Sequence, residues 1–126
     1  MSYRSPLGKV RGLGSAKDGT HHWWMQRLTA LALIPLAIWF VVNVVALLGA
    51  SHAAFAVWVK NPLSATLLIL LIAATFHHAQ LGVQVVIEDY VHGAGAKLAA
   101  IILVKGAALV LAGIGVVSVL RIAFGG

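Results

Sequence analysis

Two long stretches of this sequence carry no charged residue, and a third carries only two. The uncharged stretches are 28–51 and 61–87, and Leu98–Phe124 is interrupted only by Lys105 and Arg121. A helix needs about 20 residues to cross a hydrocarbon core of roughly 30 Å. Runs of this length lack the alternation of a barrel strand. The sequence therefore predicts an all-α membrane protein with three transmembrane helices. These helices are expected near residues 24–49, 63–88 and 97–123.

The composition supports a membrane protein with a single domain. The 126 residues are 61% hydrophobic and 10% charged, whereas soluble domains carry about 25% charged residues. The length is too short for more than one domain, so residues 1–126 are predicted to form one. Cysteine is absent, and the chain therefore has no thiolate ligands for zinc or an iron–sulfur cluster. An iron–sulfur donor of electrons to this chain must lie on another chain.

Lysine and arginine are distributed unevenly along the chain. Five of the nine lie between the N-terminus and Arg27, whereas the first loop between predicted helices holds only Lys60. The positive-inside rule places the N-terminus, with a polar tail over residues 1–22, in the cytoplasm. Three spans then put the loop Glu88–Lys97 in the cytoplasm and the C-terminus outside. This topology explains the net charge of +6, so no nucleic-acid partner is expected.

Two adjacent histidines lie inside the second apolar run. His77 and His78 are about ten residues from its predicted end, which places them roughly 15 Å below the cytoplasmic interface at about 1.5 Å per residue. Ionisable groups at this depth are costly and indicate function. At about 100° per residue, the two side chains point in different directions. His78 shares a helical face with Gly82, and His77 shares one with Gln80.

These histidines have two interpretations. In the first, His78 is a neutral imidazole ligand to a haem iron, and Gly82, one turn along, leaves room for the flat macrocycle. In the second, both histidines hydrogen-bond to neighbouring helices, as we also expect of Asn43 in the first helix. Adjacent histidines of one helix cannot bind opposite faces of one iron. A bis-histidine haem would therefore take its second ligand from another polypeptide.

Polar residues also mark the cytoplasmic end of the second predicted helix. Glu88, Asp89 and Tyr90 form either a solvated helix end or a polar site at the membrane surface. In the second interpretation, the tyrosine hydroxyl donates to a quinone carbonyl and a carboxylate relays protons. On the same side, Arg27 is either a positive-inside anchor or, with His21, a binding group for haem propionates. The guanidinium fork is well suited to carboxylates.

The spacing of these residues resembles that of a known family. The stretch from His78 to Gly93 reads H-A-Q-L-G-V-Q-V-V-I-E-D-Y-V-H-G. It is similar to the H-x-x-x-G-x-x-x-x-x-x-D-Y-V signature of the smaller, cytochrome b556-type membrane anchor of succinate dehydrogenase (respiratory complex II). The stretch Gln26–Ala30, Q-R-L-T-A, resembles the start of that family's first helix, and the N-terminal tail resembles bacterial members. With the three-helix plan, the resemblance covers nearly the whole chain.

The resemblance implies a haem shared between two chains. In the family, one haem b lies between two anchor chains, and each chain supplies one histidine. By motif position, His78 is this chain's axial ligand, with Gly82 beside the macrocycle. Arg27 and His21 would face the haem propionates.

The resemblance also implies a function. The chain would be a membrane-anchoring subunit of succinate:ubiquinone oxidoreductase, which serves the tricarboxylic acid cycle and the respiratory chain. Tyr90 would contact the carbonyl of ubiquinone, with Asp89 near the same site. The chain alone lacks a succinate-oxidising site, so its partners would be a flavoprotein subunit, an iron–sulfur subunit and a second three-helix anchor. The expected location is the bacterial inner membrane rather than the mitochondrial one. The alternatives are an anchor that works in the fumarate-reducing direction and a haem-free structural membrane protein.

Overall fold

The structure, a computed structural model, describes Pro6 and residues 17–125. This part of the chain contains no strand. Its helices are α2 (Lys17–Ala46), α3 (His52–Lys60), α4 (Pro62–Tyr90) and α5 (Ala94–Phe124). Of these, α2, α4 and α5 are long and apolar enough to cross a membrane. The predicted all-α fold with three candidate membrane spans is therefore confirmed.

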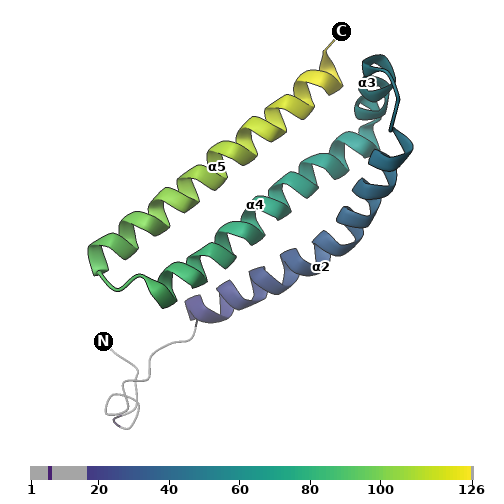
Figure 1. Cartoon of the computed structure of the whole chain (residues 1–126). Helices are drawn as coiled ribbons and strands as arrows, with labels where there is room; N and C mark the ends of the chain where they lie inside the picture. The colour runs from purple at the N-terminus through teal and green to yellow at the C-terminus, as the bar shows by residue number, and fades with distance from the viewer. Residues whose placement is uncertain (1–5, 7–16, 126) are drawn as a thin grey trace.

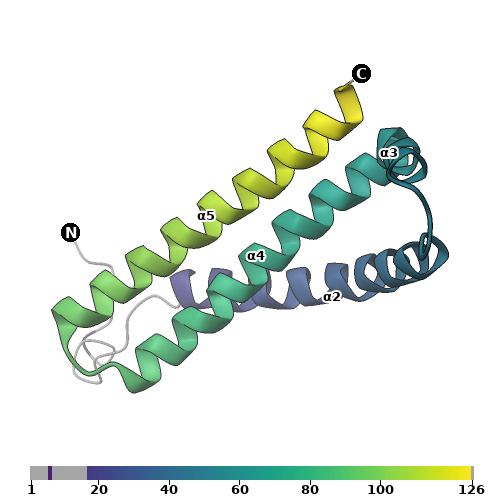
Figure 2. The same cartoon turned by 45° about the horizontal axis from the view of Figure 1, so that its top comes forward.

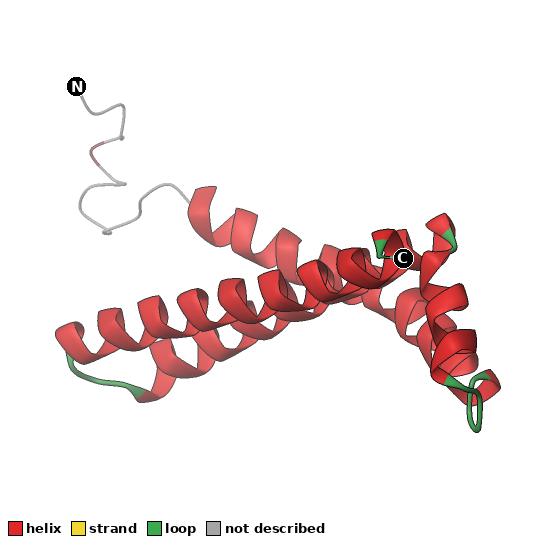
Figure 3. Ribbon diagram, turned by 90° about the horizontal axis from the view of Figure 1, so that it is seen from above, coloured by secondary structure: helices red, strands yellow, loops and turns green. Residues whose placement is uncertain are grey.

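The helix that carries both histidines lies at the centre of the bundle. α4 packs between α2 and α5 (Figure 1). The beginning of α2, the end of α4 and the α4–α5 connection lie at one end of the molecule, whereas α3 and the C-terminus lie at the other (Figure 1). α5 runs alongside α4, whereas α2 crosses α4 at an angle (Figure 2). Short loops join the helices (Figure 3).

Polar side chains cap the helices near the turn between α2 and α4. The Ser51 hydroxyl oxygen accepts a hydrogen bond from the Ala54 N–H at 3.2 Å and begins α3. Asn61 ends α3 and begins α4, because its Oδ1 accepts from the Leu63 N–H at 2.9 Å. Pro62 is the first residue of α4, where the N–H that proline lacks would have no helical partner. The chain therefore returns from α2 to α4 through a short capped helix.

Two features of the helices differ from the expectation. α2 begins at Lys17 instead of near residue 24, so the last part of the predicted tail over residues 1–22 is helical. Residues 1–5 and 7–16 of that tail lie outside the described residues. Helix α3 has only nine residues, too few to span a membrane. Hydropathy identifies runs that can cross a bilayer, and it does not show where polar turns continue a helix or form a short one.

Few apolar side chains are buried within the described chain. They are Val59, Leu68, Leu81 and Ile87, and α5 contributes none. Large apolar side chains are exposed along α2 and α5. In lipid, helices associate through close packing and inter-helix hydrogen bonds, because lipid tails are as apolar as the side chains. These exposed faces are suited to lipid tails or to helices of another chain.

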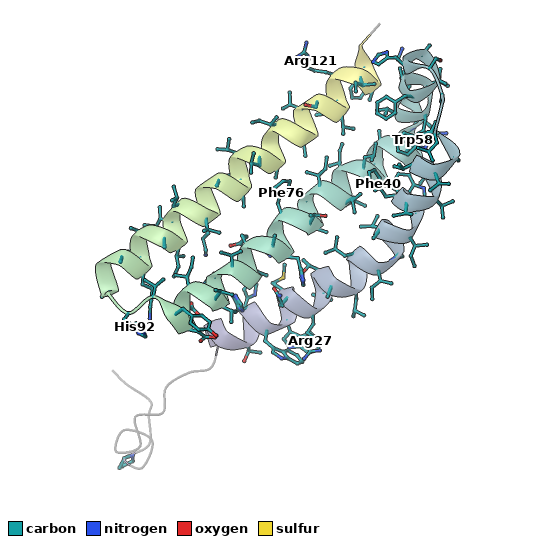
Figure 4. All side chains as sticks on the ribbon, viewed as in Figure 1. Arg27, Phe40, Trp58, Phe76, His92 and Arg121 are labelled. Carbon is teal, nitrogen blue, oxygen red and sulfur yellow. The ribbon has the colours of Figure 1, made fainter. Side chains whose placement is uncertain are left out.

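Asn43 links α2 to α3 by a hydrogen bond to Trp58, which lies at the end of the molecule remote from Arg27 (Figure 4). The Trp58 Nε1–H donates to Asn43 Oδ1 at 3.0 Å. Asn43 Nδ2 in turn donates to the Trp39 carbonyl oxygen at 2.8 Å. The Trp39 and Trp58 rings stack with their centroids 5.7 Å apart. The predicted hydrogen bond between Asn43 and a neighbouring helix is confirmed.

Candidate functional site

His78 meets a hydroxyl group of the neighbouring helix. Its Nδ1 lies 3.1 Å from Thr29 Oγ1, which belongs to α2. The Thr29 hydroxyl has a single proton, which it donates to the Met25 carbonyl oxygen at 2.7 Å, with the Gln26 carbonyl oxygen at 3.1 Å. The Met25 carbonyl oxygen is the nearest acceptor for this proton, which favours the arrangement in which Thr29 Oγ1 accepts from a protonated His78 Nδ1. In that tautomer Nε2 of His78 has a free lone pair, the form in which neutral imidazole binds metals.

A cavity of about 470 Å³ opens beside His78. Its lining residues come from α2 and α4: Gly19, His22, Trp23, Gln26, Arg27, Ala30, His78 and Val85. Arg27 therefore borders the same space as His78, and its guanidinium carbon lies 5.2 Å from the centre of the Trp23 ring. Arg27 is near the end of the molecule where α4 ends (Figure 4).

Open space and polar atoms without hydrogen-bond partners lie around this cavity. A Cβ added to Gly82 would have only Gln26 Nε2 within 4 Å, at 3.9 Å. Gln26 Oε1 and His22 Nε2 are buried and lack a hydrogen-bond partner among the described residues. These features fit a flat, anionic cofactor that contains a metal. The imidazole lone pair can bind the metal, the guanidinium can pair with the negative charge, and the open space at Gly82 leaves room for the flat ring.

His77 has a different environment from that of its neighbour. Its Nδ1 lies 3.3 Å from Gln80 Nε2. With the amide nitrogen of Gln80 as donor, Nδ1 of His77 accepts, and this contact favours the tautomer with the proton on Nε2. This Nε2 is buried and has no partner among the described residues. The neighbours of the two histidines thus favour opposite tautomers, with the lone pair at Nε2 in His78.

The His77 side of α4 borders a second cavity, of about 480 Å³. His21 lines this cavity and does not line the one beside His78, whereas His22 lines both. Lys105 of α5 reaches the same space. Towards the end of α4, Gln84 Nε2 donates to Glu88 Oε1 at 3.0 Å. A polar side of α4 therefore extends from His77 to the exposed Glu88.

The two groups of predicted site residues lie at different heights on α4. Tyr90 is the last residue of α4 and is 76% exposed, and Asp89 is also exposed. Twelve helical residues separate His78 from Tyr90, which is about 18 Å along the axis at about 1.5 Å per residue. The structure therefore separates a site at His78, within the bundle, from a polar surface at the helix end.

Thr29 is the site residue that sequence reasoning missed. It is only 8% exposed, and it lies in the stretch Gln26–Ala30 that carries the family resemblance. A hydroxyl at the start of the uncharged run 28–51 was the available signal. Within residues 17–125, no group of three or more His, Cys, Asp or Glu side chains could hold a metal ion.

The fold and the site together define a small membrane protein with three candidate spans and a histidine of the central helix that lines a surface cavity. Comparison with known proteins is consistent with this class. A sequence model of the family described as "Succinate dehydrogenase/Fumarate reductase transmembrane subunit" matches residues 1–114. The chain belongs to this family. No solved structure matches it.

Similar proteins carry related names. The chain is 37% identical over 90 residues to the succinate dehydrogenase hydrophobic membrane anchor subunit of Rickettsia bellii. The aligned region covers 71% of each protein. It is 33% identical over 102 residues to the subunit of the same name from Paracoccus denitrificans, with 81% of this chain and 78% of the relative aligned. The succinate dehydrogenase membrane anchor subunit of Reclinomonas americana is 27% identical over 92 residues, or 71% of this chain and 77% of the relative. The resemblance based on the motif is confirmed.

Proposed function

We propose that this chain is the hydrophobic membrane anchor of a succinate:quinone oxidoreductase in a bacterial inner membrane. Family membership, the names of the relatives and the three candidate spans support this proposal. The chain lacks cysteine, so it needs an iron–sulfur subunit to bring electrons and a flavoprotein subunit to oxidise succinate. A second anchor chain covers part of its exposed apolar surface.

His78 is the axial ligand that this chain offers to a shared haem b. The observation that carries this assignment is the contact between His78 Nδ1 and Thr29 Oγ1 at 3.1 Å, which favours the tautomer with an unprotonated Nε2. A haem iron needs only axial ligands from protein, because the macrocycle supplies the other four. When bound, the haem would add a one-electron carrier to the assembly. A partner anchor chain would supply the second histidine.

Arg27 and Gly82 complete the binding site on this chain. Arg27 borders the His78 cavity, and its guanidinium pairs with a propionate, replacing part of the water that an anion would otherwise keep. Gly82 leaves the surface of α4 free beside the imidazole. His21 lines only the cavity on the His77 side, so the propionates are assigned to Arg27.

Tyr90 and Asp89 form this chain's part of the quinone-reduction site. Tyr90 is exposed at the end of α4, where the phenol O–H donates to a quinone carbonyl and polarises it. Asp89, the adjacent carboxylate, takes protons from water and passes them to the reduced quinone, which needs two electrons and two protons. Both residues lie on the side that the basic N-terminal region assigns to the cytoplasm.

The family description includes fumarate reductase as well as succinate dehydrogenase. A fumarate-reducing assembly is therefore the second candidate function. The potential of the quinone sets the direction of electron flow, whereas the anchoring role of this chain is the same in both.

Purification of the tagged chain from membranes with its bound partners tests the proposal. We expect covalent or tightly bound flavin in the preparation, and a b-type haem spectrum in the reduced-minus-oxidised difference. Flavin without haem would contradict the role of His78 and retain the anchor assignment. A preparation without flavin would contradict the proposed function as a whole.

A further inference from the structure

We propose that Thr29 is a positioning residue for the haem ligand. Its hydroxyl oxygen accepts the Nδ1–H of His78, fixes the tautomer, and holds the ring so that Nε2 faces the cavity shared with Arg27. The inference rests on the proposed function, because it assigns Thr29 a role towards a haem that His78 binds.

The hydrogen bonds of Thr29 favour its hydroxyl as an acceptor towards His78. Its proton is directed to the backbone of its own helix, at 2.7 Å from the Met25 carbonyl oxygen. A rotating hydroxyl could either donate to His78 or accept from it, but the bond to Met25 disfavours the first option. In the opposite tautomer, Thr29 would have to turn its proton from the Met25 carbonyl oxygen at 2.7 Å to His78 Nδ1 at 3.1 Å. The bond to Met25 therefore favours the Nδ1–H tautomer of His78.

The position of Thr29 on a neighbouring helix also restricts the orientation of the His78 imidazole. Thr29 is 8% exposed and lies on α2, whereas His78 lies on α4. The rotation of the His78 side chain on α4 is thus limited by a hydrogen bond to an atom of α2. An acceptor on the non-ligating nitrogen orients a metal-binding histidine and raises the basicity of the ligating nitrogen. A more basic Nε2 stabilises the oxidised iron relative to the reduced iron.

Other hydroxyl groups in the chain show that this arrangement is specific. Thr66 Oγ1 donates to the Pro62 carbonyl oxygen at 2.7 Å, and Ser118 Oγ donates to the Ile114 carbonyl oxygen at 2.7 Å. Both have the same bond to their own helix as Thr29, and among the described residues neither has a hydrogen bond to a histidine. The backbone bond alone is therefore an ordinary feature of these helices. Thr66 consequently provides a matched control.

The test compares Thr29→Val, which removes the hydroxyl and keeps the shape, with Thr29→Ser, which keeps the hydroxyl. Each variant is purified as the whole complex, and the haem-to-flavin ratio, the haem midpoint potential and the low-temperature electron paramagnetic resonance spectrum are measured. For Thr29→Val we expect haem binding about tenfold weaker, as for other partners of metal-binding histidines. We also expect a higher midpoint potential and a shifted ferric resonance. Thr29→Ser and Thr66→Val should both resemble the wild type.

The outcomes separate this inference from the proposed function. A wild-type complex with flavin and no haem would overturn both the haem proposal and the role of Thr29. A haem-containing wild type with an unchanged Thr29→Val spectrum and potential would overturn the role of Thr29 alone. Equal changes in Thr66→Val would overturn it too, because they would indicate general packing. If Thr29→Val does not assemble, Thr29→Ala compared with Thr29→Ser isolates the hydroxyl in the same way.

Discussion

His77 and His78 are adjacent in sequence, but their neighbours favour protons on different ring nitrogens. The helical turn between them directs His78 towards the hydroxyl of Thr29 and His77 towards the amide of Gln80. A hydroxyl whose proton is already donated accepts, whereas an amide nitrogen donates. Identical side chains therefore acquire different metal-binding capacity from one neighbouring atom each.

The first prediction separates the two histidines. His78→Ala should remove most of the haem from the purified complex, because His78 is the proposed ligand in the cavity beside Arg27. His77→Ala should retain the haem, since His77 lines the other cavity. The ratio of haem absorbance to flavin fluorescence in each preparation measures the difference. Loss of haem from His77→Ala with retention in His78→Ala would reverse the ligand assignment.

The second prediction concerns Tyr90. Tyr90→Phe removes one hydroxyl from an exposed position, so it should not disturb folding. A single hydrogen bond to the quinone contributes about 0.5–1.5 kcal/mol net, so quinone reduction should slow by roughly two- to tenfold. Succinate oxidation with a soluble dye as acceptor should be unchanged and serves as the control. Parallel loss of both activities would instead indicate defective assembly.

The divergence of His77 and His78 could be predicted from sequence, because the angle between successive residues is a property of every helix. The bond between Thr29 and His78 could not be predicted in this way. It depends on the register in which α2 packs against α4, and that register is set by side chains of both helices. For the same reason, His21 and Arg27 were grouped by their sequence position, although they line different cavities.

Among the helices, the α4–α5 contact includes a close approach at a glycine. A Cβ added to Gly115 would lie 3.2 Å from Ile72 Cδ1 and 3.3 Å from Ile72 Cγ2. These distances are shorter than ordinary van der Waals contact, so Ile72 would have to move. The absence of a side chain at Gly115 therefore allows α4 and α5 to approach each other closely.

The third prediction tests this packing. Gly115→Ala should cost about 1–3 kcal/mol through overpacking, offset by about 1 kcal/mol of improved helix propensity. Ile72→Val removes the nearest methyl group, so the double variant should recover part of the loss, with a coupling of at least about 0.5 kcal/mol. Unfolding of the purified chain by detergent titration, followed by helicity, measures these values.

Gly113 supplies the matched control for this experiment. No heavy atom of the described residues lies within 4 Å of a Cβ built there. Gly113→Ala should therefore give only the favourable helix-propensity contribution of about 1 kcal/mol. Equal stability changes for the alanine variants at the two glycines would show that the contact with Ile72 has no energetic effect.

The elements differ in how well sequence defines them. The spans of α4 and α5 follow from apolar length, because a lipid-exposed backbone must satisfy its own hydrogen bonds. The beginning of α2 and the whole of α3 lie outside that constraint. The capping residues Ser51 and Asn61 were visible in the sequence and mark both ends of α3.

Over the whole molecule, the two ends have different chemistry. The end that contains Arg27 also contains the α4–α5 connection with His92, whereas the opposite end contains Trp58 and Arg121 (Figure 4). The basic N-terminal region predicts that the first end faces the cytoplasm. An assembly that oxidises succinate in the cytoplasm needs its quinone site on that side. The orientation of the chain is therefore a requirement of the proposed role of Tyr90.

The fourth prediction tests this orientation with single cysteines, which are clean reporters because the chain has none. Ala50 and His92 are both exposed, and they lie in the α2–α3 and α4–α5 connections. In intact spheroplasts, a membrane-impermeant maleimide should label Ala50→Cys and leave His92→Cys unlabelled. The bilayer excludes a charged reagent, so His92→Cys should react only when the inner surface is opened.

Phe124, the exposed last residue of α5, provides an independent test of the same orientation. Three spans place it on the side of Ala50, so Phe124→Cys should react in intact spheroplasts. Labelling of His92→Cys in intact spheroplasts, with protection of both other cysteines, would show that the chain has the opposite orientation. Tyr90 would then lie on the face remote from the succinate-oxidising subunits. The quinone assignment would have to be abandoned, whereas the role of His78, which lies within the bundle, would be unaffected.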